Sequence, residues 1–438
     1  MTAAGGGELL RAAICHTPRN PFESEGALEY FADGGLLIRD GRVADCGDFS
    51  EVRAKHPQAA VRDLRGGFVL PGFIDTHVHF PQLRVLGALG RELLDWLEFV
   101  ALPEEARMED MACACDTARK FVRALAAHGT TTALVFGSHF RPATGALFRA
   151  AERVGLRVVS GLVMSDRRLR PELHQTPAEA YRDSVQLIRE YHGKGRLRYA
   201  VTPRFALSTS EEMLEVCQTL MREYPDIGFQ THINENALEV CEVSAMFPWA
   251  ADYLAVYEKF GFAGRRCVMA HNVHATDSEL ERMAASGTSV AHCPWSNAML
   301  GSGLFPFRRH LSAGVRVALG TDVGGGTGFG MLKEALEAYA MQRVAPEGLL
   351  LSPAHLLYLA TRAGAEALNL ESETGDFAVG KSADFVYLRA PEGSPLESIL
   401  DRAEGIERSL SALFTIAGAE SVVETAVGGV AVRDASGM

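Results

Sequence analysis

The sequence predicts an α/β protein whose main body is a (β/α)8 TIM barrel, joined to a small β-sandwich domain formed by the N- and C-terminal segments. From residue 71 onward, short β-branched apolar runs alternate with longer helical patterns, which is typical of βα units around a parallel sheet. Eight such runs occur, the number that a closed barrel of this kind needs. Both ends of the chain show short alternating runs broken by Gly and Asp, as in hairpins.

The eight predicted strands begin near residues 72, 129, 157, 198, 228, 267, 288 and 316. Helical patterns lie between them, for example at residues 115–129, 177–193 and 210–224. We expect residues 71–374 to form the barrel and residues 1–70 plus 375–438 to form the composite β-sandwich domain. Catalytic groups of such barrels gather where the strands end. Polar residues at strand ends are therefore the candidates for a site.

Composition restricts the class of function. The chain has 438 residues, of which 47% are hydrophobic and 22% charged, as in an ordinary soluble protein. No apolar run has the length needed to span a bilayer, so we expect no membrane association. A formal net charge of −12 and the lack of a basic stripe argue against a nucleic-acid partner and favour a small, weakly charged substrate. Without a secretory signal or a spaced cysteine framework, we expect a cytoplasmic location.

The first predicted strand ends in the stretch "PGFIDTHVHFPQ", residues 71–82. Side chains alternate faces along a strand, so His77 and His79 project to the same side, together with Asp75. Two imidazoles this close can share one metal ion. They can equally be polar core groups with satisfied hydrogen bonds, so further ligands are needed to decide.

Strands five and eight supply further candidates. In "THINEN", His232 lies at the strand end and Glu235 on the loop that follows, where "NEN" also fits a helix cap. In "ALGTDVGGG", Asp322 follows an apolar strand, although Asp before Gly is often only a turn residue. Three histidines and one carboxylate at one end of a barrel match the ligands of a zinc site with a position left for water. Such an ion lowers the pKa of water toward neutrality and generates a nucleophile.

Other polar residues at strand ends have more than one interpretation. The sixth strand ends in "MAHNVH", where His271 could polarise a substrate carbonyl or steady the attacking water, or be a fixed supporting imidazole, and His274 is a further polar group. We expect His292, in "AHCPWSN", to have a packing or supporting role. The fourth strand ends in "TPRF" and has no Lys to bridge two ions, so one metal is expected rather than two.

Taken together, these motifs resemble those of the amidohydrolase superfamily, and within it the guanine deaminase branch. The superfamily motifs run along nearly the whole chain: "PGFIDTHVH", "GTTT", "THINE", "AHNVH", "HCPWSN", "GTDVGGG" and "GDFAVGKSADFV". Three further stretches look like the guanine deaminase branch: "HFPQ", "LLDWLEFVALPEE" and "RFALSTS".

The resemblance implies a role for each candidate. One Zn²⁺ per chain, or Fe²⁺, would be held by His77, His79, His232 and Asp322. Glu235 would shuttle protons and His271 would lie close to the attacked carbon. A purine base would be held by Gln82, Arg204 and Phe205, with Trp96 as a possible second wall.

The resemblance implies hydrolysis of guanine to xanthine and ammonia by a homodimer. Asp322 or Glu235 would take a proton from the water, and Glu235 would protonate a ring nitrogen of guanine. The same chemistry on 8-oxoguanine, cytosine, adenine or a triazine is the nearest alternative, and a metal-free scaffold on the same fold is another. Two residues also have simpler alternatives: Arg204 could be a surface or salt-bridging residue, and Trp96 could be core.

Overall fold

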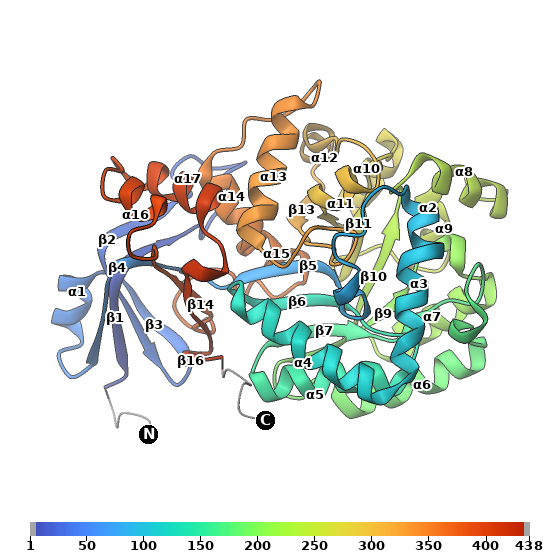
Figure 1. Ribbon diagram of the computed structural model, residues 1–438, viewed down its shortest axis with the longest axis horizontal. Helices are drawn as coiled ribbons and strands as arrows, with labels where there is room; N and C mark the ends of the chain where they lie inside the picture. The colour runs from blue at the N-terminus through green and yellow to red at the C-terminus, as the bar shows by residue number, and fades with distance from the viewer. Residues whose placement is uncertain (1–5, 433–438) are drawn as a thin grey trace.

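The computed structural model describes residues 6–432 as a barrel with a separate sheet beside it (Figure 1). Eight parallel strands follow one another in chain order, as the sequence predicts. They are β5 (Phe73–His79), β6 (Thr130–Phe136), β7 (Arg157–Gly161), β9 (Leu197–Pro203), β10 (Gly228–Ile233), β11 (Cys267–His271), β12 (Ser289–His292) and β13 (Arg316–Leu319). A two-residue strand, β8 (Val163–Met164), pairs with β9. The predicted fold class is confirmed. Within the described range, no helix is both long and apolar enough to cross a membrane.

Helices follow the barrel strands, and those up to α12 return the chain to the start of the next barrel strand. They are α4 (Met111–Ala127), α5 (Arg141–Val154), α6 (Pro177–Tyr191), α7 (Glu211–Glu223), α8 (Ala237–Met246), α9 (Tyr253–Lys259), α10 (Asp277–Ser286), α11 (Pro294–Met299), α12 (Phe307–Ala313), α13 (Met331–Val344), α14 (Pro353–Ala360) and α15 (Arg362–Ala367). Local sequence fixes their ends. Thr176 and Glu179 form a capping box at the start of α6, and Gly155 ends α5 in the left-handed conformation.

The barrel closes at a seam between β5 and the segment that follows β13. The Asp322 amide donates to the His77 carbonyl at 2.8 Å, and the His79 amide donates to the Val323 carbonyl at 2.8 Å. Gly320 permits this approach, because a Cβ atom there would lie 2.7 Å from the Cβ of His77. The first and last strands therefore meet beside His77, His79 and Asp322, which the sequence predicts as metal ligands.

The two ends of the chain form one seven-stranded sheet, at the left of Figure 1. Its strand order is β16-β15-β14-β4-β1-β2-β3. The elements of this part are β1 (Glu8–His16), β2 (Glu29–Arg39), β3 (Arg42–Asp48), α1 (Phe49–Lys55), β4 (Ala60–Pro71), β14 (Phe385–Leu388), α16 (Pro395–Leu400), α17 (Ile406–Ile416), β15 (Val422–Val427) and β16 (Val430–Ala431). As expected, N- and C-terminal segments share this unit. Residues 1–5 and 433–438 of the expected domain lie outside the described residues.

Hydrogen bonds beyond the strand ladder close the terminal sheet on itself. The Val43 amide donates to the Lys381 carbonyl, and the Ala383 amide donates to the Gly41 carbonyl. Apolar side chains from β1, β2, β3, β4, β14 and β15 fill a common core, which is distinct from the main core of the barrel. These bonds bring the loop between β2 and β3 against the segment that leads into β14, so the sheet curves around its core.

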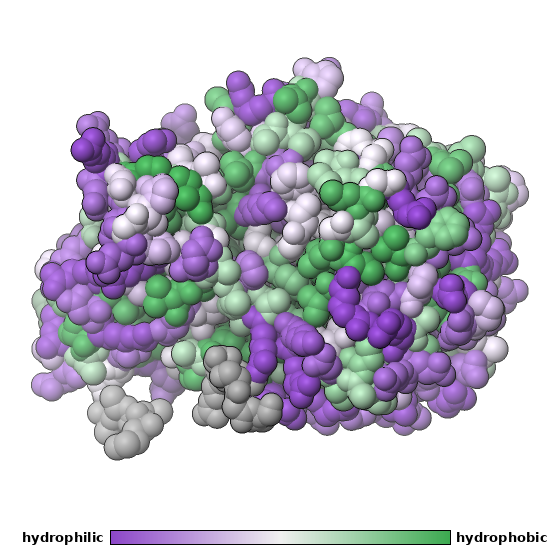
Figure 2. Space-filling model, viewed as in Figure 1, coloured by the Kyte–Doolittle hydropathy of each residue, from purple (hydrophilic) through white to green (hydrophobic). Residues whose placement is uncertain are grey.

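A helical insertion between β5 and α4 covers part of the end of the barrel where the strands finish. It consists of a 3-10 helix, η1 (Phe80–Val85), followed by α2 (Leu93–Trp96), a π-helix, η2 (Leu97–Ala101), α3 (Leu102–Ala106) and a second 3-10 helix, η3 (Arg107–Glu109). Leu93, Trp96 and Ala101 form a small apolar cluster with Leu300. In the view of Figure 2, apolar side chains gather over the region where Figure 1 places α2 and the ends of β10 and β11.

Candidate active site

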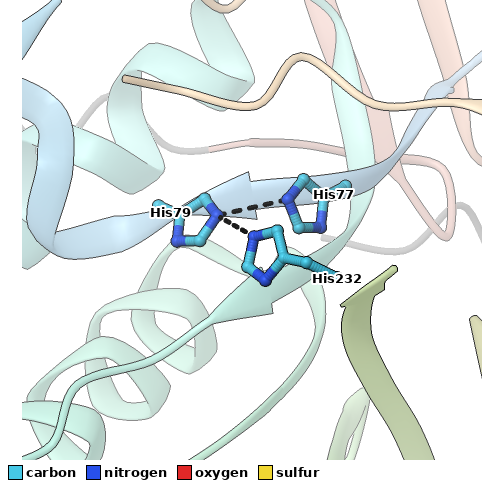
Figure 3. A group of neighbouring side chains, drawn as sticks. All are labelled: His77, His79 and His232. Atoms are coloured by element: carbon cyan, nitrogen blue, oxygen red, sulfur yellow. Dashed lines mark hydrogen bonds between the residues drawn. The ribbon is translucent and has the colours of Figure 1, made fainter. Parts of the chain in front are cut away.

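Three buried histidine side chains meet at the end of the barrel strands. His77 and His79 come from β5 and His232 comes from β10 (Figure 3). The Nε2 atom of His79 lies 3.2 Å from the Nε2 of His77 and 3.2 Å from the Nε2 of His232. The structure therefore brings together the three histidines that the sequence assigns to one site.

The nitrogen of His232 that faces the other two rings carries a lone pair. Nδ1 of His232 lies 2.6 Å from the Arg204 carbonyl oxygen, which can only accept, so the proton of the neutral ring is on Nδ1. Burial lowers the pKa of His77 to about 3 and lowers that of His232 well below its usual value, which keeps both rings neutral at pH 7. A neutral imidazole with a free nitrogen is the form that binds a metal ion.

Asp322 adds a carboxylate to the three imidazoles. Its Oδ1 lies 3.3 Å from the Nε2 of His77 and 3.2 Å from the Nε2 of His79. Burial alone would raise the pKa of Asp322, but the contacts with these two histidines hold it well below its usual range. Ligand atoms that surround zinc tetrahedrally at about 2.0–2.1 Å stand about 3.3 Å from one another. The His77–His79, His79–His232, His77–Asp322 and His79–Asp322 pairs have about that spacing, and the three histidines form one compact group of metal-binding atoms, so the residues present fit a zinc ion.

Asp322 lies in a strained backbone segment that a second carboxylate holds in place. Its φ of 46° is in the left-handed region, which costs a residue other than glycine about 1–2 kcal/mol. Asp75 accepts hydrogen bonds from the amide of the neighbouring Thr321 at 3.0 Å and from its hydroxyl at 2.5 Å. These bonds stabilise the turn, so Asp75 supports the site by fixing where Asp322 lies.

Glu235 and His271 lie beside the metal donors. Nε2 of His271 is 3.5 Å from Oε2 of Glu235 and 3.9 Å from Oδ2 of Asp322. Burial, followed by the charges of Asp322 and Glu239, raises the pKa of Glu235 well above its usual value and favours the protonated carboxyl. Among the described residues, Oε1 of Glu235 has no hydrogen-bond partner. That oxygen is therefore free to contact a bound molecule.

Asn297, on α11, orients the ring of His271. Its Oδ1 lies 2.9 Å from Nδ1 of His271, so Nδ1 carries the proton of the neutral ring and Nε2 presents a lone pair toward Glu235. The sequence motif "HCPWSN" contains Asn297, but sequence analysis did not identify its role. Nothing in the motif indicates which side chain its amide contacts.

A cavity lies next to the metal donors. All four residues expected to bind substrate line it, namely Gln82, Trp96, Arg204 and Phe205. His79, His232, Asp322, Glu235 and His271 line the same cavity. Aromatic rings and leucine side chains therefore form its walls, while ionisable groups lie at its base.

Glu105, which sequence analysis did not identify, holds two of the cavity residues. Arg204 Nη1 donates to its two carboxylate oxygens at 2.8 and 2.7 Å, and Gln82 Nε2 donates to Oε1 at 2.7 Å. Burial alone would raise the pKa of Glu105, but the charge of Arg204 lowers it to about 2. Arg204 thus lines the cavity and also forms a salt bridge, so two roles that the sequence offered as alternatives occur together. Glu105 lies on α3 of the insertion and not at a strand end, so the strand-end pattern does not predict it.

Two other histidines lie outside this cavity. His274 is exposed, with its Nε2 2.8 Å from the Ser302 carbonyl oxygen. His292 is buried and stacks on Phe305, with 4.2 Å between the ring centroids, and burial lowers its pKa to about 3. His292 therefore packs in the core, consistent with the packing role expected for it.

Comparison with known proteins identifies the same family along most of the chain. The amidohydrolase family matches residues 68–432, and an imidazolonepropionase-like composite domain of bacteria matches residues 34–59. A probable guanine deaminase of Deinococcus radiodurans is 56% identical over 428 residues, which cover 96% of this chain and 98% of the relative. The guanine deaminase of Escherichia coli is 40% identical over 95% of this chain and 94% of the relative.

A solved structure has the same architecture throughout. The guanine deaminase from Bradyrhizobium japonicum superposes with a TM-score of 0.93 at 36% identity, and the match covers 100% of both chains. The family match, the near full-length relatives and this structural likeness agree with the donor set found at the barrel end. The chain belongs to the amidohydrolase family.

Proposed function

We propose that this chain hydrolyses guanine to xanthine and ammonia. One observation carries the proposal: a single cavity has metal donors and a protonated carboxyl at its base, and hydrogen-bond donors and aromatic rings on its walls. The two relatives that are 56% and 40% identical are named as guanine deaminases, which supports guanine as the substrate.

One zinc ion per chain is part of the proposal. It would be held by His77, His79, His232 and Asp322. When bound, zinc supplies Lewis-acid chemistry that lowers the pKa of water toward neutrality. The same donors also accept iron, so the metal content of the purified protein is to be measured directly. A homodimer and a cytoplasmic location complete the proposal, and light scattering of the purified protein tests the dimer.

Two carboxyl groups in different environments divide the proton transfers. Asp322 is ionised and accepts a proton from the attacking water, while His271 accepts a hydrogen bond from that water at Nε2. The water oxygen forms a bond to C2 of guanine, and the electron pair of the C2–N3 double bond takes the proton that Glu235 carries. Carbon C2 becomes tetrahedral in this step.

Collapse of the tetrahedral carbon releases ammonia. The exocyclic nitrogen on C2 takes up a proton, the C2–N bond breaks, and the new hydroxyl loses its proton to become the C2 carbonyl of xanthine. Glu235 is suited to carry protons between these atoms, because Oε1 is free and the pKa of its carboxyl is raised. One water is consumed for each ammonia released.

The walls of the cavity account for purine binding in this proposal. Arg204 and Gln82 offer N–H donors to the carbonyl-bearing edge of the base. Phe205 and Trp96, which are both almost fully buried, cover the flat faces of the ring.

Ammonia release from guanine, adenine, cytosine, 8-oxoguanine and an aminotriazine, assayed side by side, tests the proposed function. We expect guanine to react fastest, with xanthine as the product. Chelation of the metal should abolish turnover, and added zinc should restore it. A protein that is loaded with metal but inactive on guanine would contradict the proposal.

A further inference from the structure

Glu105 connects the helical insertion to the ends of several barrel strands. Its side chain, on α3, is 2% exposed and contacts Arg204 after β9, Gln82 after β5 and His139 after β6. A buried carboxylate with several donors around it is held rigidly, because each donor would be costly to leave unpaired. The position of Glu105 therefore fixes the groups that donate to it.

The guanidinium group of Arg204 is held through one of its three nitrogen atoms only. Both of its contacts with Glu105 come from Nη1. Within residues 6–432, Nε and Nη2 of Arg204 donate to no protein acceptor. Because Arg204 lines the cavity, these N–H groups are available to a bound molecule. Glu105 thus sets the direction of the guanidinium and balances its buried charge.

Gln82 is fixed in the same way. Its Nε2 donates to Glu105 at 2.7 Å, and its Oε1 accepts from the Gly324 amide at 3.1 Å. These two bonds define which end of the amide is nitrogen and leave one N–H of Nε2 for a ligand. Gln82 and Arg204, which both contact Glu105, therefore offer N–H donors to the cavity.

His139 lies beside Glu105. Its Nδ1 is 3.4 Å from Oε2 of Glu105, and its Nε2 is 2.7 Å from the hydroxyl oxygen of Ser165. Among the described residues Nδ1 makes no hydrogen bond, so the ring packs next to the carboxylate and does not replace the bonds from Arg204 and Gln82.

We propose that Glu105 is a positioning residue that sets the preference of this site for a purine with an oxygen acceptor at C6. The inference rests on the proposed function. The groups that Glu105 aims are N–H donors, which pair with a ring carbonyl and do not pair with an amine or a hydrogen at that carbon. A site with buried donors discriminates strongly against analogues that leave those donors unpaired.

Guanine and 2-aminopurine together test this inference, because they share the reacting amine at C2 and differ in the oxygen at C6. We expect wild-type kcat/KM to favour guanine by about 100-fold or more. In Glu105→Gln the side chain keeps its shape but offers one acceptor oxygen where Arg204 and Gln82 now use two. The KM for guanine should rise about tenfold or more with a smaller change in kcat, whereas kcat/KM for 2-aminopurine should change little.

Glu104→Gln is the matched control. Glu104 is the preceding residue on α3, and it pairs with the exposed Arg84 at 2.6 Å outside the cavity. The kcat and KM of the Glu104→Gln variant should equal those of the wild type. If Glu105→Gln retains the wild-type preference for guanine, or loses both activities in parallel, Glu105 does not set specificity. A wild-type protein inactive on guanine would instead refute the proposed function.

A double variant keeps the test valid if the single change prevents folding. Glu105→Gln combined with Arg204→Gln removes both buried charges together, so no unpaired charge remains. If Glu105 acts through Arg204, the double variant and Arg204→Gln alone should have similar kcat/KM for guanine. Fully additive losses would show that Glu105 does not act through Arg204 and would overturn that part of the inference.

Discussion

At the residue scale, contacts on the far side of each ring decide what the active-site histidines present to the cavity. The Arg204 carbonyl places the proton of His232 on Nδ1, and Asn297 does the same for His271. In both cases Nε2 is left as a lone pair facing the site. A backbone oxygen and an amide oxygen on the far side of the two rings thus fix which nitrogen each ring presents to the cavity.

Replacement of Glu235 by Gln tests its role as the proton carrier. The amide keeps the shape of the side chain but cannot carry the proton, so kcat should fall by about 10²–10⁴-fold. Metal content should not change, because the donor set consists of other residues. Steady-state kinetics with elemental analysis measures both quantities, and Glu242→Gln, on the partly exposed face of α8, is the control. Turnover at the wild-type rate would remove Glu235 from the mechanism.

Residues of the site differ in how far the sequence predicts them. His77, His79 and His232 could be found because strand alternation and strand ends place them together. Glu105 and Asn297 could not, because their importance depends on which side chains fold against them. A glutamate in a helix and an asparagine after a proline-containing motif look ordinary until Arg204 and His271 are seen beside them.

At the element scale, the helical insertion is attached to the barrel by two kinds of contact. Glu105 provides the polar attachment, and Trp96 provides an apolar one through a cluster that includes Leu93 and Leu300. This cluster is separate from the main core. The insertion also contributes Phe80 and Met108 to the main core, so the Trp96 cluster bears mainly on the part of the insertion that lines the cavity.

Replacement of Trp96 by Ala tests how strongly this element depends on one side chain. Loss of a buried Trp typically costs about 3–5 kcal/mol, and here the cost falls on a small cluster. We expect faster hydrogen exchange of the amides in residues 93–101 and a higher KM for guanine. Phe99→Ala is the control, since Phe99 lies in the same segment but is 57% exposed. Unchanged exchange in the Trp96 variant would show that the insertion is held by other contacts.

At the scale of the whole molecule, Asp384 joins the terminal sheet to the barrel. Its side chain accepts from the Gly428 amide at 2.7 Å and from the Thr374 hydroxyl at 2.9 Å, and it lies 3.7 Å from Arg157 of β7. Its carbonyl accepts from the Gly72 amide at the start of the barrel. One buried aspartate thus connects four segments that are far apart in the chain.

Asp384→Ala should destabilise the protein without altering its chemistry. The change leaves the buried guanidinium of Arg157 and the Gly428 amide without this partner, which typically costs about 3–5 kcal/mol. Urea unfolding measures the loss in free energy, and the KM and metal content of the folded fraction should remain at wild-type values. The exposed Asp401→Ala is the control. If the variant is as stable as the wild type, contacts other than those of Asp384 join the terminal sheet to the barrel.

The overall architecture follows closely from sequence patterns, with one limit. The eight βα units are repeated and strongly apolar, so their number and type could be predicted, and helices such as α6 begin at recognisable caps. Short alternating runs predicted strands at both ends of the chain. Their order in the sheet could not be predicted, because the pairing of β4 with β14 depends on contacts between residues far apart in sequence.

The seam of the barrel brings the two ends of the barrel segment together at the site. His77 and Asp322 belong to opposite ends of this segment, and the backbone hydrogen bond between them forms only when the first and last strands meet. A partly folded chain therefore lacks this pair of side chains, however many of its strands are already in place. A metal ion held by both residues would bind only to the closed barrel and would oppose its reopening along the same line.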